Sequence, residues 1–243
     1  MEKLIVEFGV RKSIARDFGY EEKLLMHREE DIPYKAILKD GKVVAIVSRR
    51  YSLIENERVV EVVKKIAENE GYELDIKNEF PRLYCFLMKD DYGFLVANSV
   101  DGSISLRIDL ILKLNNVPIA IRTEELTKFY RRHIGNIRSS INKISDIMKE
   151  VVKYKDKIKL TIDEMSKIYI KDIKDSIEAL KEILPKKYFK DIHAKMLDGE
   201  LVTLKDVYVA TVTKIWNQSP SMKRTIKLYQ KLNRIILRIV MMK

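Results

Sequence analysis

Cysteine, glycine and proline are scarce in this chain. Its 243 residues include one Cys, 8 Gly and 5 Pro, so no internal disulfide can form and little of the chain has a linker composition. Cys85 lies in an apolar run and is predicted to be a small buried side chain. With 46% hydrophobic and 34% charged residues, the composition excludes a mainly disordered protein. Abundant Lys, Glu and Ile fit a thermophilic protein, because ion-pair networks cost less at high temperature.

Long apolar runs are also absent. No stretch of about 18 apolar residues occurs, which disfavours a membrane span. Glu2 and Glu7 interrupt the first ten residues, which therefore do not resemble a signal peptide. These absences predict a soluble, intracellular protein of the cytoplasm, with no membrane partner.

Signatures of common catalytic chemistry are missing. His27, His133 and His193 are far apart in the sequence and give no zinc-ligand spacing with the single Cys. The Gly-x4-Gly-Lys-Ser/Thr loop of ATP-driven motors and the Gly-x-Ser-x-Gly elbow of hydrolases do not occur. We therefore expect no catalytic residues, no metal and no cofactor.

One triplet leaves a metal-dependent nuclease open as a third alternative. Glu73, Asp75 and Lys77 alternate on an expected strand, as in sites where carboxylates hold Mg²⁺ and a Lys orients water. No upstream Asp partner can be identified. Such triplets also arise by chance in a chain this rich in charge.

Acidic residues stop at Asp206. No Asp or Glu follows it, whereas eight cations do, and the chain has a net charge of +11. The part up to Ile121 has 19 Lys and Arg against 21 Asp and Glu, and the remainder has 28 against 15. All of the net positive charge therefore belongs to the second part. Clustered cations of this kind favour a polyanionic partner, because they release condensed counterions when they meet phosphates.

The first 121 residues have the pattern of an α+β lobe. Asp40-Gly41 and Asp101-Gly102 predict two hairpins, and a helix is expected over residues 55–69, closed by Gly71. The expected order is ββαββββ, in one mainly antiparallel sheet with one wet face and one core face. The expected strands are residues 35–39, 42–48, 72–79, 82–89, 92–100 and 103–114.

Residues 122–243 have a helical period and predict a basic, all-helical lobe. One long helix is expected over residues 124–155. The patterns Thr161-x-x-Glu164 and Thr203-x-x-Asp206 fit capping boxes that open two later helices, and Ser221 can cap the last one.

The last expected helix combines a broad apolar face with a row of cations. Lys227, Lys231, Arg234 and Arg238 follow one another at spacings of four, three and four residues, which places them on one face. Like charges at these spacings destabilise a helix by about 0.2–0.5 kcal/mol per pair, so an anionic compensator is expected. Either acids elsewhere in the fold or nucleic-acid phosphates can supply it. A membrane surface is disfavoured, because the apolar face is needed for packing and lacks Trp.

Several segments resemble a phage- and plasmid-borne protein family known as domain of unknown function 932. Residues 41–56, which read GKVVAIVSRRYSLIEN, resemble its segment G-x-V-x-x-x-Y-x-x-I/V-Q/E-N, and residues 97–103 resemble its N-S-H-D-G-S segment, with Val100 in place of the His. Two later elements, C-x-N and R-H-T, resemble the sequences around Asn116 and His133, with Leu114 in place of the Cys. The residues that carry the likeness are Asn56, Asn98, Asp101, Gly102, Ser103, Asn116 and His133.

The resemblance implies a mobile genetic element, a virus or plasmid, as the setting. Its order of elements is also similar to that of single-strand annealing proteins, which need no ATP and combine a basic groove with aromatic side chains on which bases stack. The predicted nucleic-acid contacts are Arg49, Arg50, Tyr51, Arg131, Arg132, Lys223, Arg224, Lys227, Lys231, Arg234 and Arg238.

The sequence thus predicts a non-enzymatic protein that binds nucleic acid, more specifically DNA. Single-strand binding or annealing is the narrower form of this prediction, and a homo-oligomer is compatible with it. The alternative is a protein-interaction or regulatory module of a virus or plasmid, whose basic face meets an acidic partner.

Overall fold

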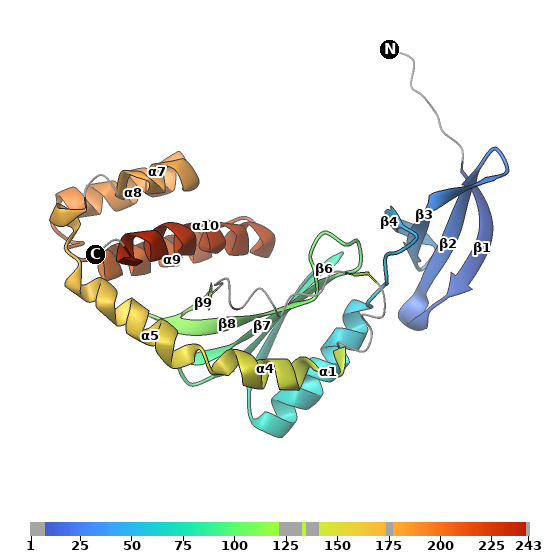
Figure 1. Ribbon diagram of the computed structural model, residues 1–243, viewed down its shortest axis with the longest axis horizontal. Helices are drawn as coiled ribbons and strands as arrows, with labels where there is room; N and C mark the ends of the chain where they lie inside the picture. The colour runs from blue at the N-terminus through green and yellow to red at the C-terminus, as the bar shows by residue number, and fades with distance from the viewer. Residues whose placement is uncertain (1–7, 122–132, 135–140, 174–176, 242–243) are drawn as a thin grey trace, which may run out of the picture. The chain divides into compact units, whose positions relative to one another are not determined.

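The computed structural model describes residues 8–121, 133–134, 141–173 and 177–241. In these residues two antiparallel sheets, of four and five strands, are followed by helices (Figure 1), which confirms the α+β class. None of the helices in this described part is both long and apolar enough to cross a membrane.

The first sheet contains four strands in sequence order. They are β1 (Gly9–Ala15), β2 (Tyr20–His27), β3 (Glu30–Lys39) and β4 (Lys42–Ser48), with the short helix η1 (Asp17–Gly19) after β1. Asp40 and Gly41 have φ of 49° and 77° between β3 and β4, as a tight hairpin turn requires, so this predicted hairpin is confirmed. The strands β1 and β2 were not expected.

A helix and a second sheet follow. They are α1 (Asn56–Glu70), β5 (Glu73–Glu79), β6 (Arg82–Lys89), β7 (Tyr92–Ser99), β8 (Arg107–Leu114) and β9 (Val117–Ile121), with strand order β5-β6-β7-β8-β9. Gly71 ends α1 with φ of 71° and donates its N–H to the carbonyl of Ala67. The observed order is ββββαβββββ in two sheets. The expected ββαββββ order in one sheet is therefore wrong, although its helix and its strands 72–79 and 82–89 match the structure within one residue.

The second expected hairpin is also different. Asp101 and Gly102 lie in a longer loop, residues 100–106, between β7 and β8. The hydroxyl of Ser99 donates to the carbonyl of Ile104 at 3.0 Å and accepts its N–H at 2.9 Å. Side-chain hydrogen bonds therefore close this loop, where a two-residue turn was predicted.

The remaining described elements are helical. They are α4 (Ile144–Val152), α5 (Lys155–Glu164), η2 (Met165–Lys167), η3 (Ile170–Asp172), α7 (Leu180–Ile183), α8 (Lys186–Leu197), α9 (Leu204–Gln218) and α10 (Met222–Met241). The predicted capping box of Thr203 and Asp206 is confirmed at the start of α9. The one at Thr161 is wrong, because Thr161 lies inside α5 and donates its hydroxyl to the carbonyl of Lys157.

One continuous helix over residues 124–155 does not form. Ile134 makes an isolated antiparallel bridge with Tyr51, and a turn at residues 153–154 separates α4 from α5. Most of the first half of that expected helix lies outside the described residues.

The chain divides into two compact units, each built from three stretches. One is Met1–Leu87, Val96–Ile108 and Phe129–Ile147, and the other is Met88–Leu95, Asp109–Lys128 and Met148–Lys243. Each unit therefore takes residues from both sides of the predicted boundary at residue 121. In the first unit a core of Tyr20, Ile37, Tyr51, Leu53 and Val100 lies under the four-stranded sheet.

Candidate nucleic-acid interface

Helix α10 packs in the second unit through one broad face. It contacts α9, α7 and β9. Burial of this mainly apolar face supplies the energy that holds the helix against its neighbours. Its buried side chains are Met222, Thr225, Ile226, Leu228, Tyr229, Leu232, Asn233, Ile236 and Ile239.

Three buried hydrogen bonds fix the rotation of α10 about its axis. The hydroxyl of Tyr208 donates to Oδ1 of Asn233 at 2.8 Å, and Nδ2 of Asn233 donates to the carbonyl of Ala120 at 3.4 Å. The hydroxyl of Tyr229 donates to the carbonyl of Val212 at 3.2 Å. A different rotation would leave these polar groups unpaired in the core, so the opposite face of α10 is held toward solvent.

That opposite face carries the α10 cation row. All of its six members are exposed: Lys223, Arg224, Lys227, Lys231, Arg234 and Arg238. With about 100° of rotation and 1.5 Å of rise per residue, they fall within an arc of about 100° and extend over roughly 22 Å. The structure therefore presents six predicted contact residues as one continuous strip.

No ion pair neutralises this strip within the part of the chain that the structure describes. Other lysines of the same unit are paired, because Lys153 contacts Glu150 at 2.6 Å, and Lys195 contacts Glu200 at 2.9 Å. The sequence left two sources of negative charge open for these cations, acids within the fold and nucleic-acid phosphates. Among the described residues, no acid of the fold pairs with them.

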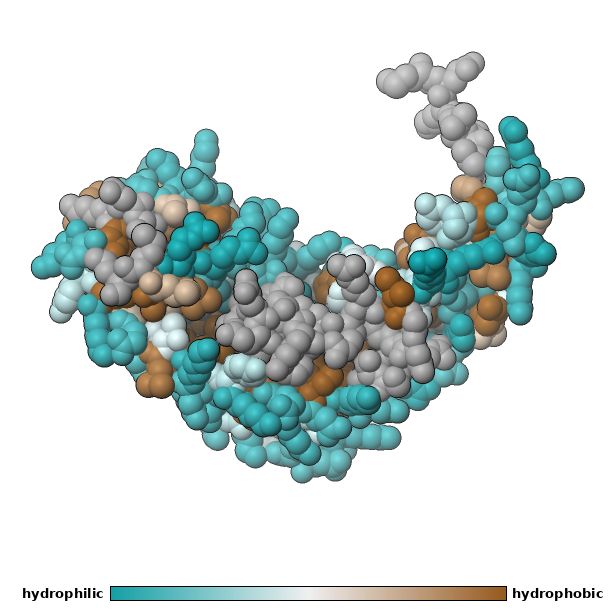
Figure 2. All heavy atoms as spheres, in the orientation of Figure 1, coloured by the Kyte–Doolittle hydropathy of each residue, from teal (hydrophilic) through white to brown (hydrophobic). Residues whose placement is uncertain are grey.

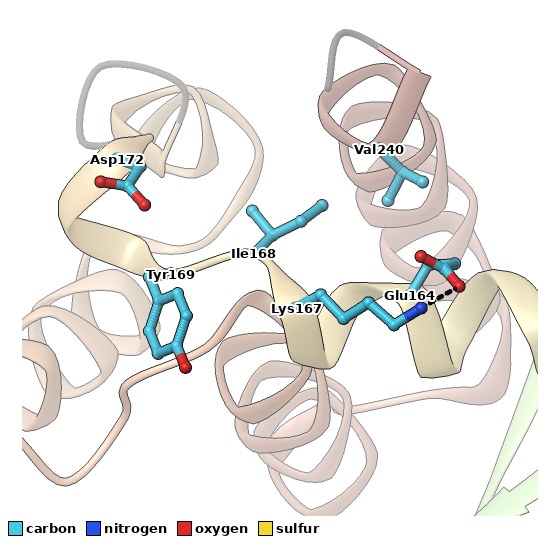
Figure 3. A pocket seen from close by; sticks show the side chains of 6 residues that line it. All are labelled: Glu164, Lys167, Ile168, Tyr169, Asp172 and Val240. Carbon is cyan, nitrogen blue, oxygen red and sulfur yellow. Dashed lines mark hydrogen bonds and ion pairs between the residues drawn. The ribbon is translucent and has the colours of Figure 1, made fainter.

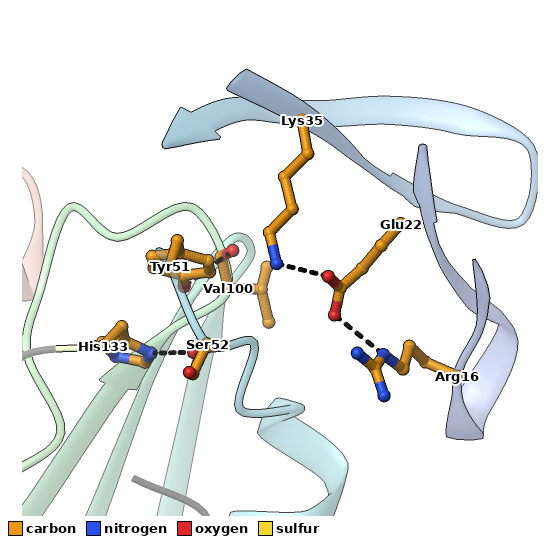
Figure 4. A network of polar contacts seen from close by, with 7 residues as sticks. All are labelled: Arg16, Glu22, Lys35, Tyr51, Ser52, Val100 and His133. Carbon is orange, nitrogen blue, oxygen red and sulfur yellow. Dashed lines mark hydrogen bonds and ion pairs between the residues drawn. The ribbon is translucent and has the colours of Figure 1, made fainter. Parts of the chain in front are cut away.

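Tyr51 is a core residue, which corrects its prediction as a base-stacking contact. Its side chain is buried, at 8% exposure. Its hydroxyl donates to the carbonyl of Ser99 at 3.1 Å and to the carbonyl of Val100 at 3.0 Å, and Figure 4 draws the contact with Val100. An added Cβ on Gly102 would lie 3.0 Å from Cε2 of the ring. The ring is therefore enclosed by the loop after β7 and has no face open to a base.

His133 is held against the segment that follows β4. Its Nδ1 lies 3.2 Å from the carbonyl oxygen of Ser52, and the N–H of Ser52 donates to the carbonyl of His133 at 2.9 Å (Figure 4). Burial lowers the pKa of His133, because desolvation disfavours the imidazolium. A neutral, enclosed imidazole of this kind is a structural contact of the first unit.

Two other residues of the family likeness, Asn56 and Asn98, join α1 to β7. Asn98 donates its Nδ2 to Oδ1 of Asn56 at 2.9 Å and to the carbonyl of Ile54 at 3.0 Å. In turn, Asn56 donates to the carbonyl of Pro81 at 3.3 Å. Both side chains are buried, so they satisfy backbone groups of the core.

The other motif residues shape turns. Asp101 accepts the N–H of Ser103 at 2.9 Å, and Gly102 has a φ of 72°. Asn116 has a φ of 62° in the tight turn between β8 and β9, a conformation that Asn tolerates better than most residues. The motif residues thus account for buried contacts and turns of the fold.

A buried ion network next to Tyr51 could not be read from the sequence. Glu22 is 2% exposed and pairs with Arg16 at 2.8 Å and with the buried Lys35 (Figure 4). In the sequence, Glu22 is one of several neighbouring charged residues, and charged side chains usually face solvent. Buried charges persist only when they are paired, so this network fixes the contact of β2 and β3 with the core.

The predicted arginines differ in their positions. Arg49 is partly buried and contacts Asp31 at 3.2 Å and the carbonyl of Leu25 at 3.4 Å. Arg50 is exposed. Arg131 and Arg132 lie outside the described residues. Among the predicted contact residues, the structure therefore places the six cations of α10 on one face. Arg49 is not a free cation, because Asp31 pairs with it.

Two further places in the described residues carry clustered polar groups, the triplet on β5 and a pocket beside η2 and η3. Lys77 and Asp75 form a 3.9 Å ion pair on β5, and no group of three or more possible metal ligands occurs among the residues that the structure describes. A pocket of about 340 Å³ lies beside η2 and η3 (Figure 3). The described residues that line it are Glu164, Lys167, Ile168, Tyr169, Asp172 and Val240.

Comparison with protein-family models, curated proteins and solved structures finds no match for this chain. The likeness to domain of unknown function 932 therefore remains a prediction from the motif residues. Function has to be argued from the exposed cations of α10.

Proposed function

We propose that this protein binds nucleic acid through the α10 cation row, without catalysis and without a cofactor. The observation that carries the proposal is that six exposed cations share one helix face and have no ion-pair partner among the described residues. Holding them together is unfavourable in the free protein, because neighbouring like charges on a helix repel. A phosphate backbone relieves that repulsion and releases its own counterions.

The shape of the row favours a linear polyanion. The six charges extend over roughly 22 Å of a straight helix, and successive phosphates of one B-form strand are about 3.4 Å apart along the axis. Several cations can therefore contact phosphates at once. An acidic protein surface has no comparable regular spacing, so it fits this row less well.

Contacts of this type are independent of base sequence. The one aromatic residue of α10, Tyr229, is buried, so the exposed face has cations for phosphates and no aromatic ring for stacking. DNA in a phage or plasmid is the expected substrate, from the motif residues. Single-strand binding or annealing is the narrower form of the proposal.

Fluorescence anisotropy over a salt series tests it. Labelled single-stranded and double-stranded DNA of the same sequence are titrated with the intact protein. If all six cations meet phosphates, log K falls with log salt with a slope near −4 for single strands and −5 for duplex. No binding to either DNA at about 50 mM salt would contradict the proposal. Binding to an acidic protein but not to DNA would support the regulatory module instead.

A further inference from the structure

A second group of exposed cations lies on α8, in the same compact unit as α10. We call them the α8 lysines: Lys186, Lys187 and Lys190. With about 100° of rotation per residue, they fall within an arc of about 100°. The buried side chains of this helix lie on its opposite side: Tyr188, Phe189 and Ile192.

Acids of the fold form no ion pair with the α8 lysines in the part of the chain that the structure describes. Asp191, on the same helix, contacts Lys214 of α9 instead. Glu182 of α7 is exposed and pairs with none of the three. By contrast, Lys195 near the other end of α8 contacts Glu200 at 2.9 Å. The cations without ion-pair partners are therefore those at the start of the helix.

The first turns of α8 and α10 adjoin the same end of α9, because both helices pack against α9 (Figure 1). The hydroxyl of Tyr188 in α8 donates to the carbonyl of Gln218, the last residue of α9, at 2.6 Å. The α10 cation row begins five residues later, at Lys223, and five residues span at most about 18 Å. The α8 lysines thus lie near the N-terminal end of the row, and Figure 2 shows hydrophilic side chains, in teal, over these helices.

We propose that a nucleic-acid strand bound on the α10 cation row continues onto the α8 lysines. This inference rests on the function proposed for α10 and extends its site to the six cations of the row and the three of α8. Lys190 follows Lys187 and Lys186 by three and four residues, spacings at which like charges destabilise a helix. Phosphates relieve that repulsion, as they do on α10.

The N-terminal ends of the two helices favour the same partner. Each end carries a partial positive charge from the aligned peptide dipoles, and neither helix has an acid in its first turn. The dipoles therefore add to the side-chain cations where the strand passes from α10 to α8.

The extended site predicts that the salt dependence of binding grows with strand length. The row covers roughly 22 Å, so about seven nucleotides fill it at about 3.4 Å per phosphate. Only a longer strand reaches the α8 lysines at the same time. For single strands, the slope of log K against log salt should therefore change from about −4 for the row alone to about −6 for all nine cations.

Anisotropy titrations with single-stranded DNA of about 7 and about 20 nucleotides test this inference. The α8 variant carries Lys186→Gln, Lys187→Gln and Lys190→Gln. Its matched control loses three lysines that are paired with Glu, through Lys167→Gln, Lys181→Gln and Lys195→Gln. Near 0.1 M salt the α8 variant should lose roughly 10- to 100-fold in affinity for the long strand and bind the short one like the wild type. The control should stay within about threefold on both strands.

Two results would overturn the inference while leaving binding on α10 intact. One is an unchanged affinity of the α8 variant for the long strand, and the other is an equal loss on the short and long strands. A wild type that binds neither strand at about 50 mM salt would refute the proposed function itself, and this inference with it. Circular dichroism verifies that both variants are folded.

Discussion

The ring of Tyr51 stacks on the imidazole of His133, with centroids 5.0 Å apart and planes 10° from parallel. These residues are 82 positions apart in the chain. The reciprocal contacts of Ser52 with His133 and the bridge from Tyr51 to Ile134 join the same two segments. The first unit therefore depends on a segment that follows both sheets in sequence.

The pH dependence of stability should report on His133. Its pKa is lowered from 6.5 by burial, so below about pH 6.5 the unfolded chain binds more protons than the folded one, and stability falls as the pH falls. His133→Phe keeps an aromatic ring beside Tyr51 and removes this titration. The melting temperature of the variant should therefore decrease less between pH 7 and pH 5 than that of the wild type. Parallel pH profiles would show that His133 contributes nothing to the acid sensitivity.

Removing the hydroxyl of Tyr51 should destabilise the first unit without affecting nucleic-acid binding. Tyr51→Phe leaves the carbonyls of Ser99 and Val100 without their donor, at a cost of about 1 to 2 kcal/mol in the free energy of unfolding. Urea denaturation measures this change. Weakened DNA binding at unchanged stability would restore Tyr51 as a contact residue.

Alanine at Gly102 should destabilise the protein more than alanine at Gly41. Both glycines have a positive φ, of 72° and 77°, so both substitutions introduce similar backbone strain. Only the new Cβ at residue 102 meets another side chain, since nothing lies within 4 Å of one at residue 41. We expect an additional loss of roughly 1 kcal/mol for Gly102→Ala from contact with Tyr51. Equal urea midpoints would mean that the loop after β7 relaxes freely.

Asn233→Ala should destabilise the second unit by about 2 to 3 kcal/mol, because the buried hydroxyl of Tyr208 loses its acceptor. In the Tyr208→Phe background that hydroxyl is absent, so the same substitution should cost less. Urea titrations of the two single variants and the double variant measure this coupling. Additive losses would show that the Tyr208–Asn233 hydrogen bond does not stabilise the packing of α10.

Local signals made part of this fold predictable. Gly71 ends α1 and Asp40-Gly41 turns β3 into β4 because a positive φ strongly favours such residues at those positions. The apolar period of α10 identified its buried face, and therefore the exposed cations, because a helix in contact with a core has one apolar side.

The missed features depend on contacts between distant residues. Glu22 in β2 is buried because Lys35 and Arg16 pair with it, and no local pattern distinguishes it from a solvated acid. Likewise, the apolar helical period of the sequence continues through Ile134, whereas Ile134 forms a β-bridge with Tyr51 in the structure. The burial of Tyr51 has the same origin, since its enclosing residues follow it by some 50 to 80 positions.

The central claim is that binding depends on the α10 cation row and not on positive charge in general. Two triple variants separate these possibilities, because each loses three lysines from the second unit. The row variant replaces lysines without ion partners among the described residues, and the control replaces lysines paired with Glu. The row variant carries Lys223→Gln, Lys227→Gln and Lys231→Gln. The control variant carries Lys153→Gln, Lys167→Gln and Lys195→Gln.

The most direct measurement is the anisotropy Kd of both variants over a salt series, with circular dichroism to verify folding. We predict that the row variant loses roughly 100-fold in affinity near 0.1 M salt, and that its salt slope becomes shallower by about 2 to 3. The control should stay within about threefold of the wild type, because its lysines are already neutralised. Equal losses in the two variants, or no loss in the row variant, would contradict the account.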